Sequence, residues 1–151
     1  MYQHTQIGWM TVVGLAVGFV ILLGTYFEMG ADMPGSQTVL AATVLMAVLI
    51  PVFGWLTVTV EQETVTAGFG IGLIWRRIRI KDIQAAMQVR NKWWYGWGIR
   101  AIRDGWMFNV SGLDAVELEL KNGRKFRMGT DEPEELLNAI KVRSPKFEVR
   151  R

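Results

Sequence analysis

The chain has 151 residues, half of them hydrophobic, and its 17 Lys and Arg residues outnumber its 14 acidic residues. It contains no cysteine, which excludes disulfides, thiolate nucleophiles and cysteine metal sites. It also has only one histidine and no recognisable nucleophile with its base, so we expect a protein that is not an enzyme and needs no cofactor or metal.

The charges are divided unevenly along the chain. All 17 basic residues lie at or beyond Arg76, where only 10 acidic residues accompany them, so this half has a net charge of +7. The first 75 residues hold four acidic residues and no basic one, a net charge of −4. This division predicts two parts with different surroundings.

Two uncharged apolar runs, 7–27 and 38–56, flank the polar connector 28–37. As a helix the first run would reach roughly 31 Å, about the hydrocarbon thickness of a bilayer. We therefore predict a transmembrane hairpin with both termini in the cytoplasm, because basic segments are retained on that side. A cleaved signal peptide is the alternative for the first run, but residues 1–6 supply no basic residue for one.

Two features of the hairpin region concern packing and chemistry. Gly14 and Gly18 are spaced so that another helix could approach closely, although glycine is common in membrane helices for other reasons. His4, just before the first run, is interpreted as a solvated tail residue.

Beyond residue 56 the apolar residues alternate with polar ones, which is typical of strands. Seven short strands are predicted, at 57–60, 64–67, 76–81, 83–90, 106–110, 115–120 and 124–128. In the third, Arg77, Arg79 and Lys81 share one face. Such a face is usually just solvated, but beside an anionic membrane each charge would contribute about 1 kcal/mol of attraction.

Aromatic and basic residues are interleaved in the segment 90–100. They are Arg90, Lys92, Trp93, Trp94, Tyr95, Trp97 and Arg100. Such clusters stack on nucleic-acid bases, dock at the lipid interface or bind proteins, and the alternative is that the rings pack a small core. A membrane tether favours lipid or protein contact, so we predict no nucleic-acid binding.

The segment 115–128 predicts a hairpin with a defined register. A three-residue turn with Gly123 in the left-handed conformation places Leu118 opposite Phe126 and Val116 opposite Met128. The other face then pairs Glu117 with Arg127 and Glu119 with Lys125. These carboxylates are therefore interpreted as cross-strand ion-pair partners, not as catalytic groups.

A helix is predicted after the strands. Asp131 is expected as its N-cap, with Pro133 in the first turn and Glu134 completing a capping box. Leu136, Leu137 and Ile140 form its apolar face. A basic tail, 144–151, follows.

Segments 94–100, 109–133 and 134–140 resemble the bacterial pleckstrin-homology (PH) domain family, in particular its small membrane forms with an N-terminal helical hairpin. The resemblance covers about residues 56–141 and implies a barrel of about seven antiparallel strands closed by a C-terminal helix. It further implies a non-catalytic module of the bacterial inner membrane, and some members assemble into rings. The loop 61–63 is acidic, whereas phosphoinositide-binding PH domains have a basic loop there.

Together these features predict a hairpin (1–56), a cytoplasmic PH-like domain (57–143) and a basic tail (144–151). The predicted function is a membrane-anchored interaction or scaffold protein that self-assembles or joins a membrane-protein complex. Two alternatives remain, recognition of anionic lipid by the basic and aromatic surface, and an accessory subunit of a transporter or electron-transfer complex.

Overall fold

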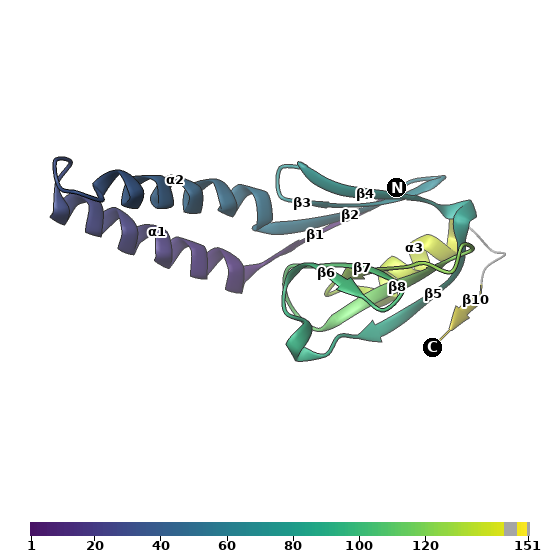
Figure 1. The fold of residues 1–151 in the computed structure, drawn as a ribbon. Coiled ribbons are helices and arrows are strands. Elements are labelled where there is room, and N and C mark those ends of the chain that lie inside the picture. Colours follow the sequence, from purple (N-terminus) through teal and green to yellow (C-terminus); the bar gives the residue numbers. More distant parts are fainter. Residues whose placement is uncertain (144–147, 151) are drawn as a thin grey trace.

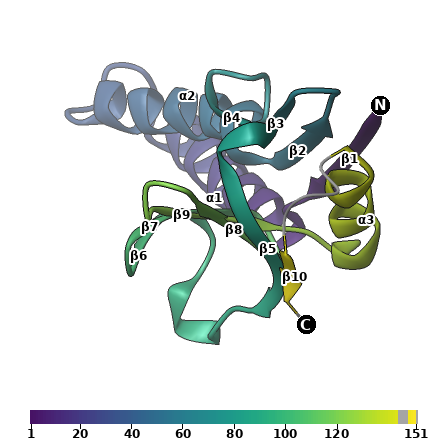
Figure 2. The ribbon, with the colours of Figure 1, turned by 90° about the vertical axis from the view of Figure 1, so that its right-hand side faces the viewer.

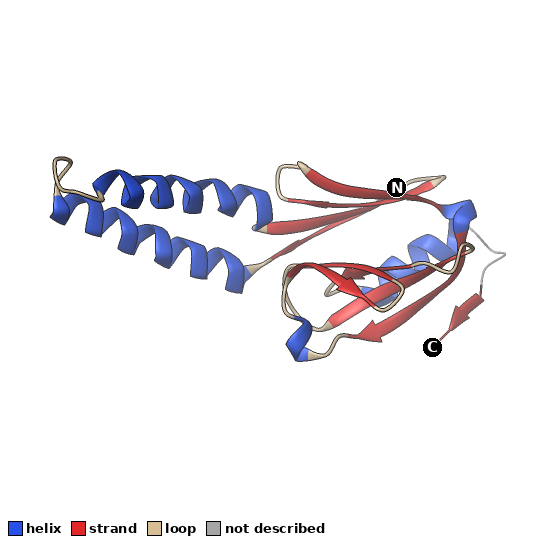
Figure 3. Cartoon of the chain, viewed as in Figure 1, coloured by secondary structure: helices blue, strands red, loops and turns tan. Residues whose placement is uncertain are grey.

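The computed structural model describes residues 1–143 and 148–150. Helices α1 (Trp9–Met29) and α2 (Ser36–Phe53) pack side by side and project together from a part made largely of strands (Figures 1 and 3). Both are long and apolar enough to cross a membrane. The predicted pair of long apolar helices is therefore confirmed.

The strands form two sheets. Sheet A is antiparallel throughout and consists, in spatial order, of β1 (Tyr2–Ile7), β2 (Trp55–Val60), β3 (Thr64–Phe69) and β4 (Ile74–Arg79). Sheet B has the order β10 (Glu148–Arg150), β5 (Ile83–Arg90), β8 (Asp114–Leu120), β9 (Lys125–Gly129), β7 (Gly105–Asn109) and β6 (Gly98–Ile102). Its β7–β9 and β10–β5 pairs are parallel.

The prediction of a closed seven-stranded barrel is wrong. The seven predicted strands correspond to β2–β5 and β7–β9, but β1 and β6 bring the number before the C-terminal helix to nine, and β10 follows that helix. Within the described residues sheets A and B do not join, because β1 and β4 are the edges of one and β6 and β10 are the edges of the other. The strands therefore form two layers with open edges.

The N-terminal residues belong to sheet A and not to a tail. The register pairs Tyr2 with Val60 and Ile7 with Trp55. At the junction with the helices, the Gly8 amide donates a hydrogen bond of 2.8 Å to the Gly54 carbonyl. Strand β1 therefore precedes α1 and strand β2 follows α2, and the two strands are neighbours in sheet A.

A single core fills the space between the two sheets. Phe108 links them, with its ring centroid 5.0 Å from that of Phe69 in sheet A and 5.1 Å from that of Phe126 in sheet B. Helix α3 (Pro133–Arg143) lies along one side of the layers, next to β1, and contributes Leu136 and Ile140 (Figure 2). Burial of each such side chain contributes about 2 kcal/mol.

The predicted β8–β9 register is confirmed for all four pairs. Gly123 has a φ of 79°, and the Gly123 amide donates to the Leu120 carbonyl at 2.8 Å. Glycine is required at this turn because other residues disfavour positive φ.

Helix α3 begins at Pro133, one residue later than an Asp131 cap requires. The Asp131 carboxylate instead contacts His4, and the Thr130 hydroxyl accepts a hydrogen bond from the Glu132 amide at 3.1 Å. The capping prediction is therefore wrong, whereas the position of Pro133 in the first turn is confirmed. In the predicted basic tail, 148–150 form β10, and 144–147 and 151 lie outside the described residues.

Candidate functional site

The turn between β3 and β4 packs against the end of helix α2. The Gly70 amide donates to the Trp55 carbonyl at 2.8 Å, and the Ile71 amide donates to the Pro51 carbonyl at 3.0 Å. Ile71 and Leu73 are 62% and 69% exposed at this turn. Sequence reasoning missed these two residues, because only the fold shows that their turn lies beside an apolar helix.

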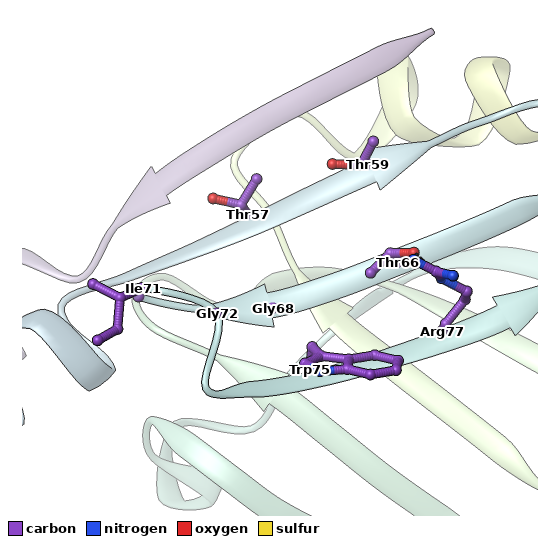
Figure 4. A pocket seen from close by; sticks show the side chains of 9 residues that line it. Thr57, Thr59, Thr66, Gly68, Ile71, Gly72, Trp75 and Arg77 are labelled. Carbon is purple, nitrogen blue, oxygen red and sulfur yellow. Dashed lines mark hydrogen bonds between the residues drawn. The ribbon is translucent and has the colours of Figure 1, made fainter.

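A shallow depression of about 460 Å³ lies next to this turn, on the face of sheet A that points away from the core (Figure 4). Thr57, Thr59 and Thr66 contribute hydroxyl groups to it. The guanidinium of Arg77 lies 5.6 Å from the ring centroid of Trp75 and donates through Nε to Thr66 at 3.4 Å. The depression thus combines hydroxyl donors, a cation and an exposed indole.

The predicted aromatic segment forms a loop between β5 and β6 that contains the short helix η2 (Trp93–Tyr95). The backbone amide of Asn91 donates a hydrogen bond of 2.6 Å to the Leu113 carbonyl. Nearby, the Ser111 hydroxyl donates a hydrogen bond of 3.2 Å to the carbonyl of Ile7, next to the start of α1. The loop therefore lies at the end of the sheets nearer the helices (Figure 3).

The rings of this loop are exposed and contact one another. Trp93 and Trp94 are 77% and 60% exposed, with ring centroids 5.9 Å apart in an edge-to-face arrangement. The Lys92 ammonium lies 5.0 Å from the ring centroid of Trp94. These rings do not pack the core, so that alternative is wrong for Trp93 and Trp94. We name Lys92–Trp97 the aromatic loop.

The predicted basic residues do not form one patch with the aromatic loop. Arg77 and Arg79 lie on β4, and Lys81 lies in η1 (Ile80–Asp82). Strand β5 separates Lys81 from Arg90, and its eight residues span roughly 26 Å at the usual rise. Arg90 and Arg100 flank the loop on β5 and β6.

The two glycines proposed for helix packing differ in their surroundings. A Cβ at Gly18 would lie 3.7 Å from the sulfur of Met46 on α2, whereas a Cβ at Gly14 would meet nothing within 4 Å. Only Gly18 therefore faces the partner helix of its own chain.

Glu117 forms a buried polar cluster on sheet B. Its carboxylate accepts hydrogen bonds from Arg127 and, at 3.0 Å, from Lys125, and Arg127 also donates to Asn91 at 2.8 Å. Burial alone would raise the pKa of Glu117, but the hydrogen bonds and charges of Arg127 and Lys125 outweigh it and lower that pKa. Lys125 lies opposite Glu119 in the strand register, as predicted. Its ammonium group, however, forms the ion pair with Glu117 and not with Glu119. A carboxylate held this firmly is suited to a structural role.

His4 is not a solvated tail residue. From β1 it reaches the start of α3, where Nε2 lies 2.6 Å from Asp131 and Nδ1 lies 3.1 Å from Glu132. Two positions along β1, the Tyr2 hydroxyl lies 3.5 Å from the Glu132 carboxylate. These contacts attach the N-terminal strand to the helix.

Comparison with known protein families finds no family model that matches this chain, and a search of curated proteins finds no similar sequence. The function is therefore argued from the structure itself.

Proposed function

We propose that this chain is a non-catalytic, membrane-anchored interaction protein, in which the hairpin of α1 and α2 crosses the membrane and the sheets bind a partner at its surface. The observation that carries this proposal is the aromatic loop, because its exposed Trp93 and Trp94 lie at the end of the sheets nearer the helices. Clustered Trp, Tyr and basic residues are typical of protein-binding hot spots.

The two junctions at Gly8 and Gly54 support a fixed position for the sheets. Each helix reaches its strand without a linker, and a hydrogen bond joins the junctions. The aromatic loop is consequently held at a defined height above the bilayer, where a partner would meet it. The basic residues beyond Arg76 favour the cytoplasmic face of a bacterial inner membrane.

The partner is a second copy of the chain or another membrane protein, as in an accessory subunit of a transporter or electron-transfer complex. A relation to the bacterial PH domain family is part of this proposal, supported by a C-terminal helix that packs on a small β-core, although the strands here form two open sheets.

Native mass spectrometry in mild detergent tests the proposal. We expect an assembly larger than one chain, or a copurifying protein, and we expect Trp93→Ser/Trp94→Ser to dissociate it. Val142→Ser, which changes an exposed apolar residue on α3, serves as the control. A strictly monomeric particle without a copurifying protein would contradict the proposal.

The depression beside Trp75 favours a second function, the binding of anionic lipid. Arg77 and three threonine hydroxyls could bind a headgroup there while Ile71 and Leu73 contact the acyl boundary. Reconstitution into anionic and neutral nanodiscs tests this function. Arg77→Gln should reduce the enrichment of anionic lipid around the protein, and equal enrichment in the wild type and the variant would exclude it.

A further inference from the structure

The open edge between the two sheets contains a basic groove at the end far from the helices. Two adjoining depressions of about 540 and 450 Å³ lie there and share Arg76 and Asn122. One wall is β4, which lines the second depression with the four consecutive residues Arg76–Arg79. The opposite wall is the turn between β8 and β9. We name this feature the edge groove.

Cations dominate the walls of the edge groove. They are Arg76, Arg77, Arg79, Lys121, Arg124 and Lys125. The two acidic residues that line it, Asp82 and Asp104, lie 2.8 Å from Arg79 and 3.9 Å from Arg103. Neither neutralises Arg76, Lys121 or Arg124, so the groove attracts anions.

Arg76 occupies an unusual position for a charged residue. It shares the inward-facing row of β4 with buried Ile78, and its guanidinium lies 5.2 Å from the ring centroid of Phe126, at the margin of the core. Among the described residues no carboxylate pairs with it. A half-buried guanidinium gains free energy when an anion pairs with it, because its hydration is already incomplete.

Strand β4 also offers unpaired backbone groups. In the described part of the chain it pairs only with β3, so its other edge faces the edge groove. An extended peptide can add to such an edge through main-chain hydrogen bonds, and its side chains then alternate between the two faces. Acidic side chains on the outer face would meet Arg77 and Arg79, and those on the inner face would meet Arg76.

We infer that the edge groove binds an extended acidic segment of a partner protein, which pairs with β4 as an added strand. This inference rests on the proposed interaction function and specifies the chemistry of a partner, which is an acidic chain in extended conformation. A headgroup of the anchoring bilayer does not fit as the occupant. The strands run from the helices at Trp55 and Phe69 toward Val60 and Arg79, so the groove lies at their distal end.

Fluorescence anisotropy with the full-length protein in nanodiscs tests the inference. The probe is a labelled ten-residue peptide of alternating Glu and Val, which can form an acidic strand. Two control peptides separate the contribution of the negative charges from the contribution of strand pairing. Replacement of each Glu by Gln removes the charge, and replacement of the central Val residues by Pro keeps the charge but prevents strand pairing.

Charge reversal in the exposed turn provides the variant. Lys121→Glu/Arg124→Glu should weaken binding of the Glu-Val peptide at least about tenfold, because two attractions become repulsions. The matched control is Arg90→Glu/Lys141→Glu, which makes the same charge change at exposed positions that line neither depression. It should leave the affinity within about twofold. Circular dichroism verifies that all variants are folded.

Three results would each overturn the inference. They are no binding of the Glu-Val peptide at millimolar concentration, equal loss of affinity in both double variants, and equal affinity for the Pro-containing peptide. Binding of inorganic pyrophosphate, but not the peptide, would assign the groove to small anions and overturn it as well. If the assembly seen by native mass spectrometry persists in any of these cases, only the edge-groove inference fails.

Discussion

Burial and neighbouring charges act in opposite directions on the carboxylate of Glu117. Its side chain is 4% exposed, between Arg127 and Lys125. Glu117→Gln would leave both cations without their carboxylate, so we expect the free energy of unfolding at pH 7 to fall by about 3 kcal/mol. Chemical denaturation in detergent, followed by circular dichroism, measures this change.

The control for this variant is Glu119→Gln on the same strand. It should lower the free energy of unfolding at pH 7 by about 0.5 kcal/mol or less. The folded pKa of Glu117 lies below its ordinary value of 4.5, so the stabilisation contributed by its charge is complete at pH values above 4.5. It is then lost as the pH falls through the lower folded pKa. Equal losses in the two variants at pH 7 would contradict the structural role.

Tyr2 should affect stability at the alkaline end of the pH range. Burial, with Glu132 and its acidic neighbours, raises the pKa of Tyr2 to about 12, so the folded chain keeps this phenol neutral after the unfolded chain ionises near pH 10. Wild-type stability should therefore fall more steeply above pH 10 than that of Tyr2→Phe, by under about 1 kcal/mol because the site is partly exposed. Parallel pH profiles would show that Tyr2 makes no such contact.

Individual residues were predictable where a local pattern determined their partners. The alternation in β8 and β9 and the glycine at 123 fixed the register, and with it the Glu117–Arg127 pair. The partners of His4 were not predictable, because Asp131 and Glu132 lie 127 and 128 positions away in the sequence. Nothing local in residues 1–7 indicates that contact.

The turn between β3 and β4 packs against the end of helix α2, close to the direct connection from α2 to β2 at Gly54. Gly70 has a φ of 48°, and a Cβ there would overlap the carbonyls of Pro51 and Val52. Gly70→Ala should therefore lower the free energy of unfolding by well over 1 kcal/mol and separate the turn from the helix. Thermal unfolding and protease sensitivity at this turn measure both effects.

Gly72→Ala is the matched control. Gly72 also has positive φ, 84°, but a Cβ there meets nothing within 4 Å, so this variant isolates the conformational cost of about 1 kcal/mol. If both variants lose the same stability, the packing of Gly70 against α2 is not important.

Elements with a strong periodic pattern were predictable, whereas those formed by long-range pairing were not. The two apolar helices, seven strands and helix α3 all follow from their sequences. Strand β1 was missed because its Gln and Thr residues give no apolar alternation, and β6 because it is an exposed edge strand. Each of these strands adds an edge to one sheet, but the barrel is open because no strand of sheet A pairs with a strand of sheet B in the described part of the chain.

At the scale of the whole molecule, the fold arranges three surfaces along one axis. The helices lie at one end, the aromatic loop and the β3–β4 turn lie beside them, and the edge groove lies at the far end. The aromatic loop was identified from sequence because its residues are contiguous. The edge groove was not, because it combines β4 with a turn more than 40 residues later.

Photo-crosslinking from position 94 in native membranes tests the central claim most directly. A photoreactive side chain replaces Trp94, and Lys141, exposed on α3, provides the control position. If the aromatic loop binds a protein partner, position 94 should form a discrete adduct with a second polypeptide, and position 141 should not. Adducts only with lipid, or the same adducts from both positions, would contradict an interaction protein that acts through this loop.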